Sequence, residues 1–294
     1  MKSFDEIFID KTKYGVKVQT TEYGEVGEHI IIDQGQSQIA GYTDREEGLF
    51  EEVPVVIFGD HTRVIKYVDE PFFLGADGVK VLRSKDDNAN YKYLYYALKN
   101  ARIPDAGYNR HFKWLKEVQI NYPDSDKQAE IVELLDKVSS VIKKREDELC
   151  ALDNLIKARF VEMFGDPSAN PRGWDETTIS DECFYIKDGP HKSLPDIGKE
   201  NGGHPFISVR NIVNGHIDFS TARYISDEDY ADAIRKCHPE KGDMLYSKGG
   251  TTGIAKLIDI DEEFANWVHV AVLKFDKSRL NGVFFENMLN CSYC

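Results

Sequence analysis

The longest regular pattern of apolar positions runs from Asp124 to Phe164 and predicts one long helix. Written in heptads, its apolar first and fourth positions are Ile131, Leu135, Val138, Ile142, Leu149, Leu152, Ile156 and Met163. Ser125 and Gln128 have the spacing of a capping box, and Gly165 and Pro167 predict the end. At about 1.5 Å per residue the helix is a rod of roughly 58 Å, which indicates a partner helix along the apolar seam.

An ordinary amphipathic helix lying on the core of its own domain is the alternative. Arg145 and Arg159 occupy fourth positions of the heptad and indicate either a specified register or a seam open to solvent. Length and persistence of the pattern favour a helix–helix seam.

Short apolar runs bounded by turn residues flank this helix on both sides. Before it, strands are predicted at 30–32, 53–58, 64–68 and 79–82, and a helix at 91–100. After it, a connector at 166–174 precedes strands at 206–209, 243–246, 254–258 and 268–275, and a helix at 284–290. The pattern predicts a mixed α/β fold with a first β-rich domain (1–123), a long coiled-coil-type helix (124–165) and a second β-rich domain (166–294).

The two domains are weakly repeated in sequence. Residues 55–82 align with residues 244–275 at an offset of about 190, with one central lysine in each copy, Lys66 and Lys256. The 91–100 helix has its counterpart at the end of the chain. The second copy therefore lacks the equivalents of residues 102–123 and of the long helix, about a third of that domain.

Composition is that of a globular chain, with 41% hydrophobic and 12% aromatic residues. No apolar run approaches the ~20 residues of a membrane span, and the N-terminus has no secretory signal pattern, so we expect a cytoplasmic protein. Five scattered cysteines argue against a disulfide framework. Cys291 and Cys294 form a CxxC without a second pair, so a zinc or redox role is not assigned.

Motifs of common enzymes are missing from the sequence. It has no G-x-G, no P-loop, no Pro-Pro, no Asp or Glu two residues before a Lys, no G-x-S-x-G and no H-E-x-x-H. The acidic run Asp259, Asp261, Glu262 and Glu263 has metal-ligating side chains, but its position between two strands favours a solvated turn. We therefore expect no metal site and no catalytic residues.

A net charge of −14 argues against indiscriminate nucleic-acid binding and leaves a site-specific reader open. Two similar domains at the ends of a rod suit a long repetitive polymer such as DNA. Polar stretches with suitable donors supply the candidate contacts. They are His61, Thr62, Arg63, Lys66, Asn109, Arg110, His111, Lys113 and Lys116 in the first domain, and Lys187, His191, Lys192, Arg210, Asn211, Lys248 and Thr251 in the second. Alternatively, Phe112, Trp114 and Leu115 are core, and Gly249-Gly250 is only a turn.

The chain resembles the specificity subunits of type I restriction-modification systems. The resemblance rests on 128–138 (QAEIVELLDKV), 152–167 (LDNLIKARFVEMFGDP) and 170–174 (NPRGW), and more loosely on FKWLK, YPDSDKQAEIV, ISVRNIVNGHID and GDMLYSKGGTTG. It covers nearly the whole chain.

This resemblance implies a non-catalytic subunit with two target recognition domains, each reading one half of a bipartite double-stranded DNA site, and two long helices packed antiparallel. Modification subunits would bring S-adenosylmethionine and the methylation chemistry, and restriction subunits would bring ATP- and Mg2+-dependent translocation and cleavage. This chain would bind no cofactor itself.

The family's second long helix is missing here, so we expect a truncated or split subunit, or an excerpt, whose helix pairs with a second copy or a complementary fragment. A competing interpretation is a helix-mediated interaction or decoy module without DNA readout. An enzyme with unrecognised motifs is the third.

Overall fold

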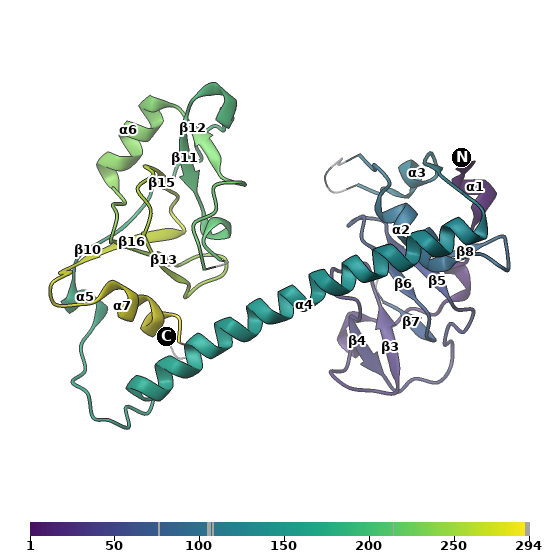
Figure 1. Cartoon of the computed structure of the whole chain (residues 1–294), viewed down its shortest axis with the longest axis horizontal. Helices are drawn as coiled ribbons and strands as arrows, with labels where there is room; N and C mark the ends of the chain where they lie inside the picture. Colours follow the sequence, from purple (N-terminus) through teal and green to yellow (C-terminus); the bar gives the residue numbers. More distant parts are fainter. Residues whose placement is uncertain (76, 105–106, 108, 214, 292–294) are drawn as a thin grey trace. The chain divides into compact units, whose positions relative to one another are not determined.

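The computed structural model describes residues 1–294 except 76, 105–106, 108, 214 and 292–294. Contacts divide the chain into two compact units, Met1–Glu146 and Asp147–Cys294, called here the first and second unit. The division falls inside one continuous helix, α4 (Ser125–Phe164), so each unit contains part of it (Figure 1). The predicted mixed α/β class, with two β-rich parts and one long helix, is confirmed. None of the helices in the described residues has the length and apolar character needed to cross a membrane.

The first unit contains two main sheets. Four antiparallel strands have the order β2-β8-β5-β6, and three strands have the order β4-β3-β7, with β3 antiparallel to β4 and parallel to β7. The bounds are β2 (Phe8–Asp10), β3 (His29–Ile32), β4 (Gly41–Thr43), β5 (Val55–Gly59), β6 (Ile65–Val68), β7 (Phe72–Leu74) and β8 (Val79–Ser84). Smaller elements are β1 (Lys2–Ser3), β9 (Gln119–Ile120), α1 (Phe4–Ile7), α3 (Phe112–Leu115), η1 (Thr12–Tyr14) and η2 (Thr20–Glu22).

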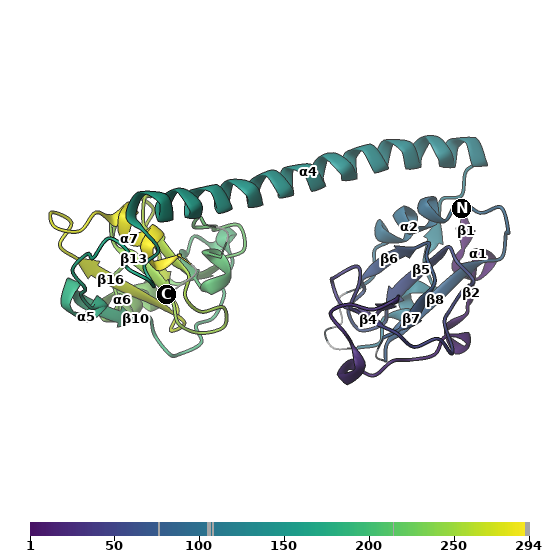
Figure 2. The ribbon, with the colours of Figure 1, turned by 90° about the horizontal axis from the view of Figure 1, so that it is seen from below.

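Alternation along the central strand β5 divides the core of this unit into two layers. Val56 and Phe58 pack with α2 (Tyr91–Lys99), whereas Val55 and Ile57 pack with the three-stranded sheet. Figure 2 shows α2 lying along β5 and β6. The helix begins at Asn90, whose side chain accepts a hydrogen bond from the Tyr93 amide at 3.0 Å. Both sheet faces are therefore covered by apolar side chains.

The second unit repeats this arrangement. Its antiparallel sheet has the order β10-β16-β13-β14, and its three-stranded sheet the order β12-β11-β15, with β11 antiparallel to β12 and parallel to β15. The strands are β10 (Cys183–Asp188), β11 (His204–Ile207), β12 (Arg223–Ile225), β13 (Met244–Ser247), β14 (Ala255–Leu257), β15 (Ala265–Asn266) and β16 (Val270–Phe275). The helices are α5 (Ile179–Glu182), α6 (Asp227–Lys236) and α7 (Gly282–Leu289), with η3 (Lys199–Asn201) and η4 (Val209–Asn211).

The two units match strand for strand, in order and direction, from β2/β10 to β8/β16. Helix α7 corresponds to α2, and Asn281 caps it as Asn90 caps α2, accepting from the Phe284 amide at 3.0 Å. The duplication inferred from residues 55–82 and 244–275 thus extends to the surrounding strands.

Helix α6 and strand β10 are absent from the elements predicted above. Ser226 caps α6 by accepting from the Asp229 amide at 3.2 Å. Three acidic residues in its first turn and two basic residues in its last suit the helix dipole. The serine cap and this distribution of charges could therefore have been used to predict α6 from the sequence.

Helix α4 begins at Ser125, one residue earlier than the capping-box pattern indicated, because a Ser125 cap would make Asp126 the first helical residue. Asp124, not Ser125, is the cap, because its carboxylate accepts from the Lys127 amide at 2.9 Å. The Gln128 side-chain Nε2 donates instead to the Pro123 carbonyl at 2.8 Å. The end is as predicted, since Gly165 has φ of +89°, which glycine adopts without strain.

Each unit holds its own part of α4 by side-chain contacts. In the first unit Ile131 and Val132 pack against the core, and Asp136 accepts hydrogen bonds from Lys92 and Tyr96 of α2, both at 2.7 Å. In the second unit Phe164 lies 5.0 Å from the Phe284 ring of α7. Between these contacts the seam is open.

The remaining seam residues are largely exposed. Leu135 is half-buried with Ile131, while Val138, Ile142, Leu149, Leu152, Ile156 and Met163 are between 47% and 64% exposed. The alternative of an ordinary helix buried on its own domain is therefore not what the structure shows for most of α4.

We expect the attachment of α4 to α2 through Asp136 to weaken at acidic pH. Hydrogen bonds from Lys92 and Tyr96 hold the Asp136 pKa below its usual 3.8, so its contribution to stability is present above that value and lost as pH falls through the lowered pKa. We expect Asp136→Asn to lower the free energy of unfolding at about pH 7 and to make almost no difference at about pH 2. Urea denaturation at both pH values measures this, and exposed Glu130→Gln is the control.

Candidate nucleic-acid interface

Three connections between strands of the first unit meet at Gln34, just after β3. Its carbonyl accepts from the Thr62 hydroxyl at 2.6 Å and its side-chain oxygen from the His61 amide at 3.1 Å. Its side-chain nitrogen donates to the Asp77 carbonyl at 2.9 Å. The connections after β3, β5 and β7 are therefore joined by the backbone and side chain of one residue.

The segment after α2 is fastened to the same place through Asp60. The Asp60 carbonyl lies 2.7 Å from the His111 amide and 3.0 Å from its ring Nδ1, and the carboxylate accepts from the Phe112 amide at 2.8 Å. Asp60 and His111 are both buried. This brings the predicted stretches at 60–66 and 109–116 together. Tyr108, which begins the second stretch, lies outside the described residues.

Three of the predicted contact residues are buried and hold loops in place. Lys66 is 2% exposed and donates to the Ser37 carbonyl at 2.6 Å, and its burial lowers its pKa against the opposing effect of Asp33. His111 is held by Asp60. Asn211 accepts from the Ser208 amide and donates to the Asp218 carbonyl, both at 2.9 Å. We correct the prediction for these three, because their side chains are engaged inside the unit and do not reach the surface.

The other candidates lie at the surface. His61 and Arg63 are half-buried, and the exposed ones are Thr62, Asn109, Arg110, Lys113, Lys116, Lys187, His191, Lys192, Arg210, Lys248 and Thr251. Lys113 lies 4.2 Å from the centroid of the Trp114 ring and Lys116 5.0 Å from that of Phe112. Leu115 is fully buried, while Phe112 and Trp114 are half-buried. Lys113 and Lys116 thus lie over aromatic rings, and of the three residues that the alternative placed in the core only Leu115 is fully buried.

In the second unit the glycine-rich turn 247–253 is closed by Ser247. Its carbonyl accepts from the Gly253 amide at 3.0 Å and its hydroxyl from the Ile254 amide at 2.8 Å. Lys248 forms an ion pair with Asp188 at the end of β10. Two of the three predicted stretches of this unit therefore meet.

Lys192 and Arg210 are engaged elsewhere in the second unit. Lys192 lies 3.9 Å from Asp229 of α6, and Arg210 donates to the Thr221 carbonyl at 2.7 Å. His269 also lies beside the glycine-rich turn. Its ring contacts Trp267, which in turn contacts Arg223, and sequence reasoning missed all three residues. Only their register in the repeated strands could have indicated them.

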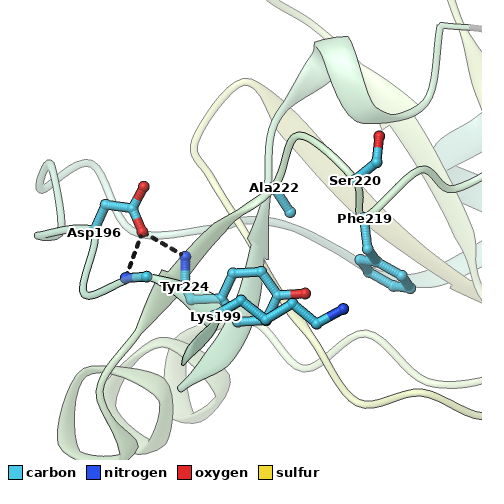
Figure 3. A pocket seen from close by; sticks show the side chains of 7 residues that line it. Asp196, Lys199, Phe219, Ser220, Ala222 and Tyr224 are labelled. Atoms are coloured by element: carbon cyan, nitrogen blue, oxygen red, sulfur yellow. Dashed lines mark hydrogen bonds between the residues drawn. The ribbon is translucent and has the colours of Figure 1, made fainter. Parts of the chain in front are cut away.

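A cavity of roughly 410 Å3 lies on the second unit, walled by Asp196, Gly198, Lys199, Phe219, Ser220, Ala222 and Tyr224. Figure 3 shows the Asp196 carboxylate turned to the backbone: it accepts from the Tyr224 and Gly198 amides, at 3.0 and 3.1 Å, and these bonds lower its pKa. Lys199 lies 6.0 Å from the Tyr224 ring. The Asp196 carboxylate holds the loop backbone in place, so we assign no ligand to this cavity.

No group of three or more His, Cys, Asp or Glu residues suited to a metal ion occurs in the described part of the chain. Of the CxxC pair, Cys291 is buried and Cys294 lies outside the described residues. In the acidic turn, Asp259 pairs with Lys256 and Asp261 with Lys241.

The comparison with protein families decides what these loops belong to. Residues 6–150 match the model of the type I restriction modification DNA specificity domain. This part of the chain is therefore a type I restriction-modification DNA specificity domain. The matched residues include Gln34, Asp60 and His111, which hold the first unit's loops together.

Two curated relatives carry the same description. The chain is 28% identical over 258 residues to the type I restriction enzyme EcoR124I/EcoR124II specificity subunit of Escherichia coli, covering 78% of this chain and 58% of that protein. It is 24% identical over 219 residues to the MjaIX specificity subunit of Methanocaldococcus jannaschii, covering 66% and 50%. The chain spans between half and three fifths of the length of these relatives.

Solved structures of such subunits are also similar. The S subunit of a type I system from M. genitalium has a TM-score of 0.47 at 18% identity, covering 98% of this chain and 75% of that one. The HsdS subunit from Thermoanaerobacter tengcongensis has a TM-score of 0.33 at 16% identity, covering 100% and 78%.

We expect the Asp60 carboxylate to contribute to the stability of the first unit. Asp60→Ala leaves the half-buried Phe112 amide without its acceptor, so we expect the free energy of unfolding to fall by about 1 kcal/mol. Asp60→Asn retains an acceptor oxygen and should lose less. Urea denaturation measures both, with exposed Glu51→Ala as the control; equal losses for the alanine and asparagine variants would contradict the assigned role.

Proposed function

We propose that this chain is the non-catalytic DNA-specificity subunit of a type I restriction-modification complex, and that each unit recognises one half of a bipartite double-stranded site. The match of residues 6–150 to a DNA specificity domain is the observation that carries the proposal. The duplicated fold supports two readers, because equivalent turns, 59–64 and 247–254, carry polar and basic side chains in both units.

The exposed candidates divide by chemistry into two kinds of contact. Lysines such as Lys113, Lys116 and Lys187 are compact cations suited to phosphate, whereas Asn109 and Arg110 have the paired donors or acceptors that base edges require. Phosphate contacts set register, and base contacts set sequence preference.

Catalysis in this proposal belongs to partner subunits in the cytoplasm. Modification subunits bind S-adenosylmethionine and methylate the DNA, and restriction subunits use ATP and Mg2+. The chain contributes no cofactor site. A helix-mediated decoy without DNA readout is not favoured, because the family match covers the domain that would do the reading.

The exposed seam of α4 supports pairing with a second long helix, either from another copy of this chain or from a complementary specificity fragment. Burying one valine, leucine, isoleucine or methionine side chain is worth about 1.5–3 kcal/mol. Six such exposed positions therefore favour association once a matching helix is present.

DNA reading predicts an enriched sequence from a random double-stranded library, with or without a purified modification subunit. The expected result is a site with two defined parts. A chain that enriches no sequence in either condition contradicts the proposal.

Lys113→Ala in the first unit predicts a loss of phosphate contact. Affinity should fall by a similar factor for all duplexes, and the slope of log K against log salt should decrease by about 1. Filter binding at several salt concentrations measures this, with exposed Lys99→Ala as the matched control. A changed base preference would show that Lys113 reads bases instead.

Helix pairing predicts a charge-sensitive association. Leu149→Asp places a carboxylate in the seam and should shift the chain toward monomer by tenfold or more in dissociation constant, because the charge must be buried or the seam left open. Ser140→Asp, on the opposite polar face, is the control. Sedimentation velocity over a range of concentrations measures both, and a wild-type monomer at all of them would require a complementary fragment as the partner.

A further inference from the structure

The two units place different side chains on equivalent backbone positions. In the three-stranded sheets, Gly41 of β4 pairs with Ile31 of β3, and Arg223 of β12 pairs with Phe206 of β11. Because the remaining pairs of these strands also correspond, Gly41 and Arg223 occupy the same place in the repeated fold.

The next strand gives two further differences. Leu74 pairs with Ile32 in β7, and Asn266 pairs with Ile207 in β15, so the residues that follow are Gly75 and Trp267. The connection then ends at Gly78 before β8 and at His269 before β16. At three positions the first unit has glycine where the second has Arg223, Trp267 and His269.

These three side chains of the second unit are in contact with one another. The Arg223 guanidinium lies 5.6 Å from the centroid of the Trp267 ring, and the Trp267 and His269 rings are 5.4 Å apart. Trp267 is fixed from below by Phe206, at 6.5 Å, and its amide donates to the Ile207 carbonyl at 2.9 Å. Trp267 therefore contacts both the arginine and the histidine.

His269 connects the group formed by Arg223, Trp267 and His269 to the glycine-rich turn 247–253. Its carbonyl accepts from the Lys248 amide at 3.0 Å. Its ring lies so close to the turn that a Cβ on Gly249 would come within 2.4 Å of Nδ1. Gly249 is required for this contact, and the imidazole is consequently held beside Lys248, one of the predicted contact residues.

The side-chain donors of Arg223 and His269 are available for a ligand. Among the described residues, no hydrogen-bond acceptor is found for the Arg223 guanidinium or the His269 ring; Arg223 is half-buried and His269 exposed. The carboxylate of Asp196 is near enough for the Arg223 charge to help lower its pKa, but it is engaged with backbone amides. A guanidinium that lies over an aromatic ring is attracted by it and keeps its planar fork of N–H donors for another partner.

We propose that Arg223 and His269, supported by Trp267, read base edges in the half-site of the second unit. The inference rests on the proposed DNA-reading function and names the side chains that make the two units differ. A fixed arginine fork suits the O6 and N7 acceptors of guanine in the major groove, and a neighbouring imidazole suits an adjacent base. The first unit, with glycine at all three positions, must read its half-site through other groups.

Selection from a random double-stranded library tests this with the full chain and a purified modification subunit. Arg223→Ala should abolish preference at one or two adjacent base pairs in one half-site, with about tenfold or greater loss of discrimination there. The other half-site should be unchanged. Arg223→Lys retains the charge without the fork and should not restore the preference. His269→Ala should alter a neighbouring base pair.

Arg235→Ala on α6 is the matched control, since Arg235 is exposed and paired with Asp232 in the same unit. Thermal melting shows whether each variant is folded, and Arg223→Gln and His269→Gln replace any that is not. If the wild type selects a site and the variants keep the same base preference, this inference is overturned and the proposed function is not. The same holds if a variant loses affinity equally for all sequences. Failure of the wild type to select any site overturns the proposed function and the inference with it.

Discussion

Main-chain hydrogen bonding of the central strands β3 and β11 is the constraint on which both units depend. Each strand is antiparallel to one neighbour and parallel to the other, so its amides and carbonyls are used on both edges. Such pairing fixes the register, and a slip of one residue would turn every side chain to the opposite face. The backbone therefore sets where loops emerge, while the side chains at those places are free to differ. This separation allows one fold, used twice, to carry two different sets of surface side chains.

Helix α4 imposes a second requirement, which its own chain does not meet. Ile131 near its start and Phe160 near its end are held by the units, but the residues between them expose an apolar stripe to solvent. A lone exposed leucine needs no explanation, whereas a continuous stripe at heptad spacing marks an interaction surface. The two arginines in the fourth heptad positions interrupt it and would favour one register over others.

The sequence predicted this helix well because its signal is long and periodic. It also predicted the buried strands, such as 53–58, since continuous apolar runs between turns have few other interpretations. It did not separate Lys66, His111 and Asn211 from the exposed candidates. Asn211 is held by its near neighbours Ser208 and Asp218. Lys66 and His111, however, depend on Asp33 and Asp60, 33 and 51 residues away in the chain, and no local pattern reveals those contacts. Arg223, Trp267 and His269 were missed for the same reason: the contact that unites them spans β12 and the β15–β16 connection, more than 40 residues apart in the chain.

The protein's acidity explains how its candidate cations are presented. An acidic protein easily neutralises surface lysines in ion pairs, as Lys241 does with Asp261 and Lys11 with Glu52. Three of the proposed contact groups are arranged differently. In the described part of the chain, Lys113, Lys187 and Arg223 form no ion pair and lie on the rings of Trp114, Tyr185 and Trp267. An aromatic face orients a cation without cancelling its charge, so these side chains keep their attraction for DNA although the chain as a whole repels it.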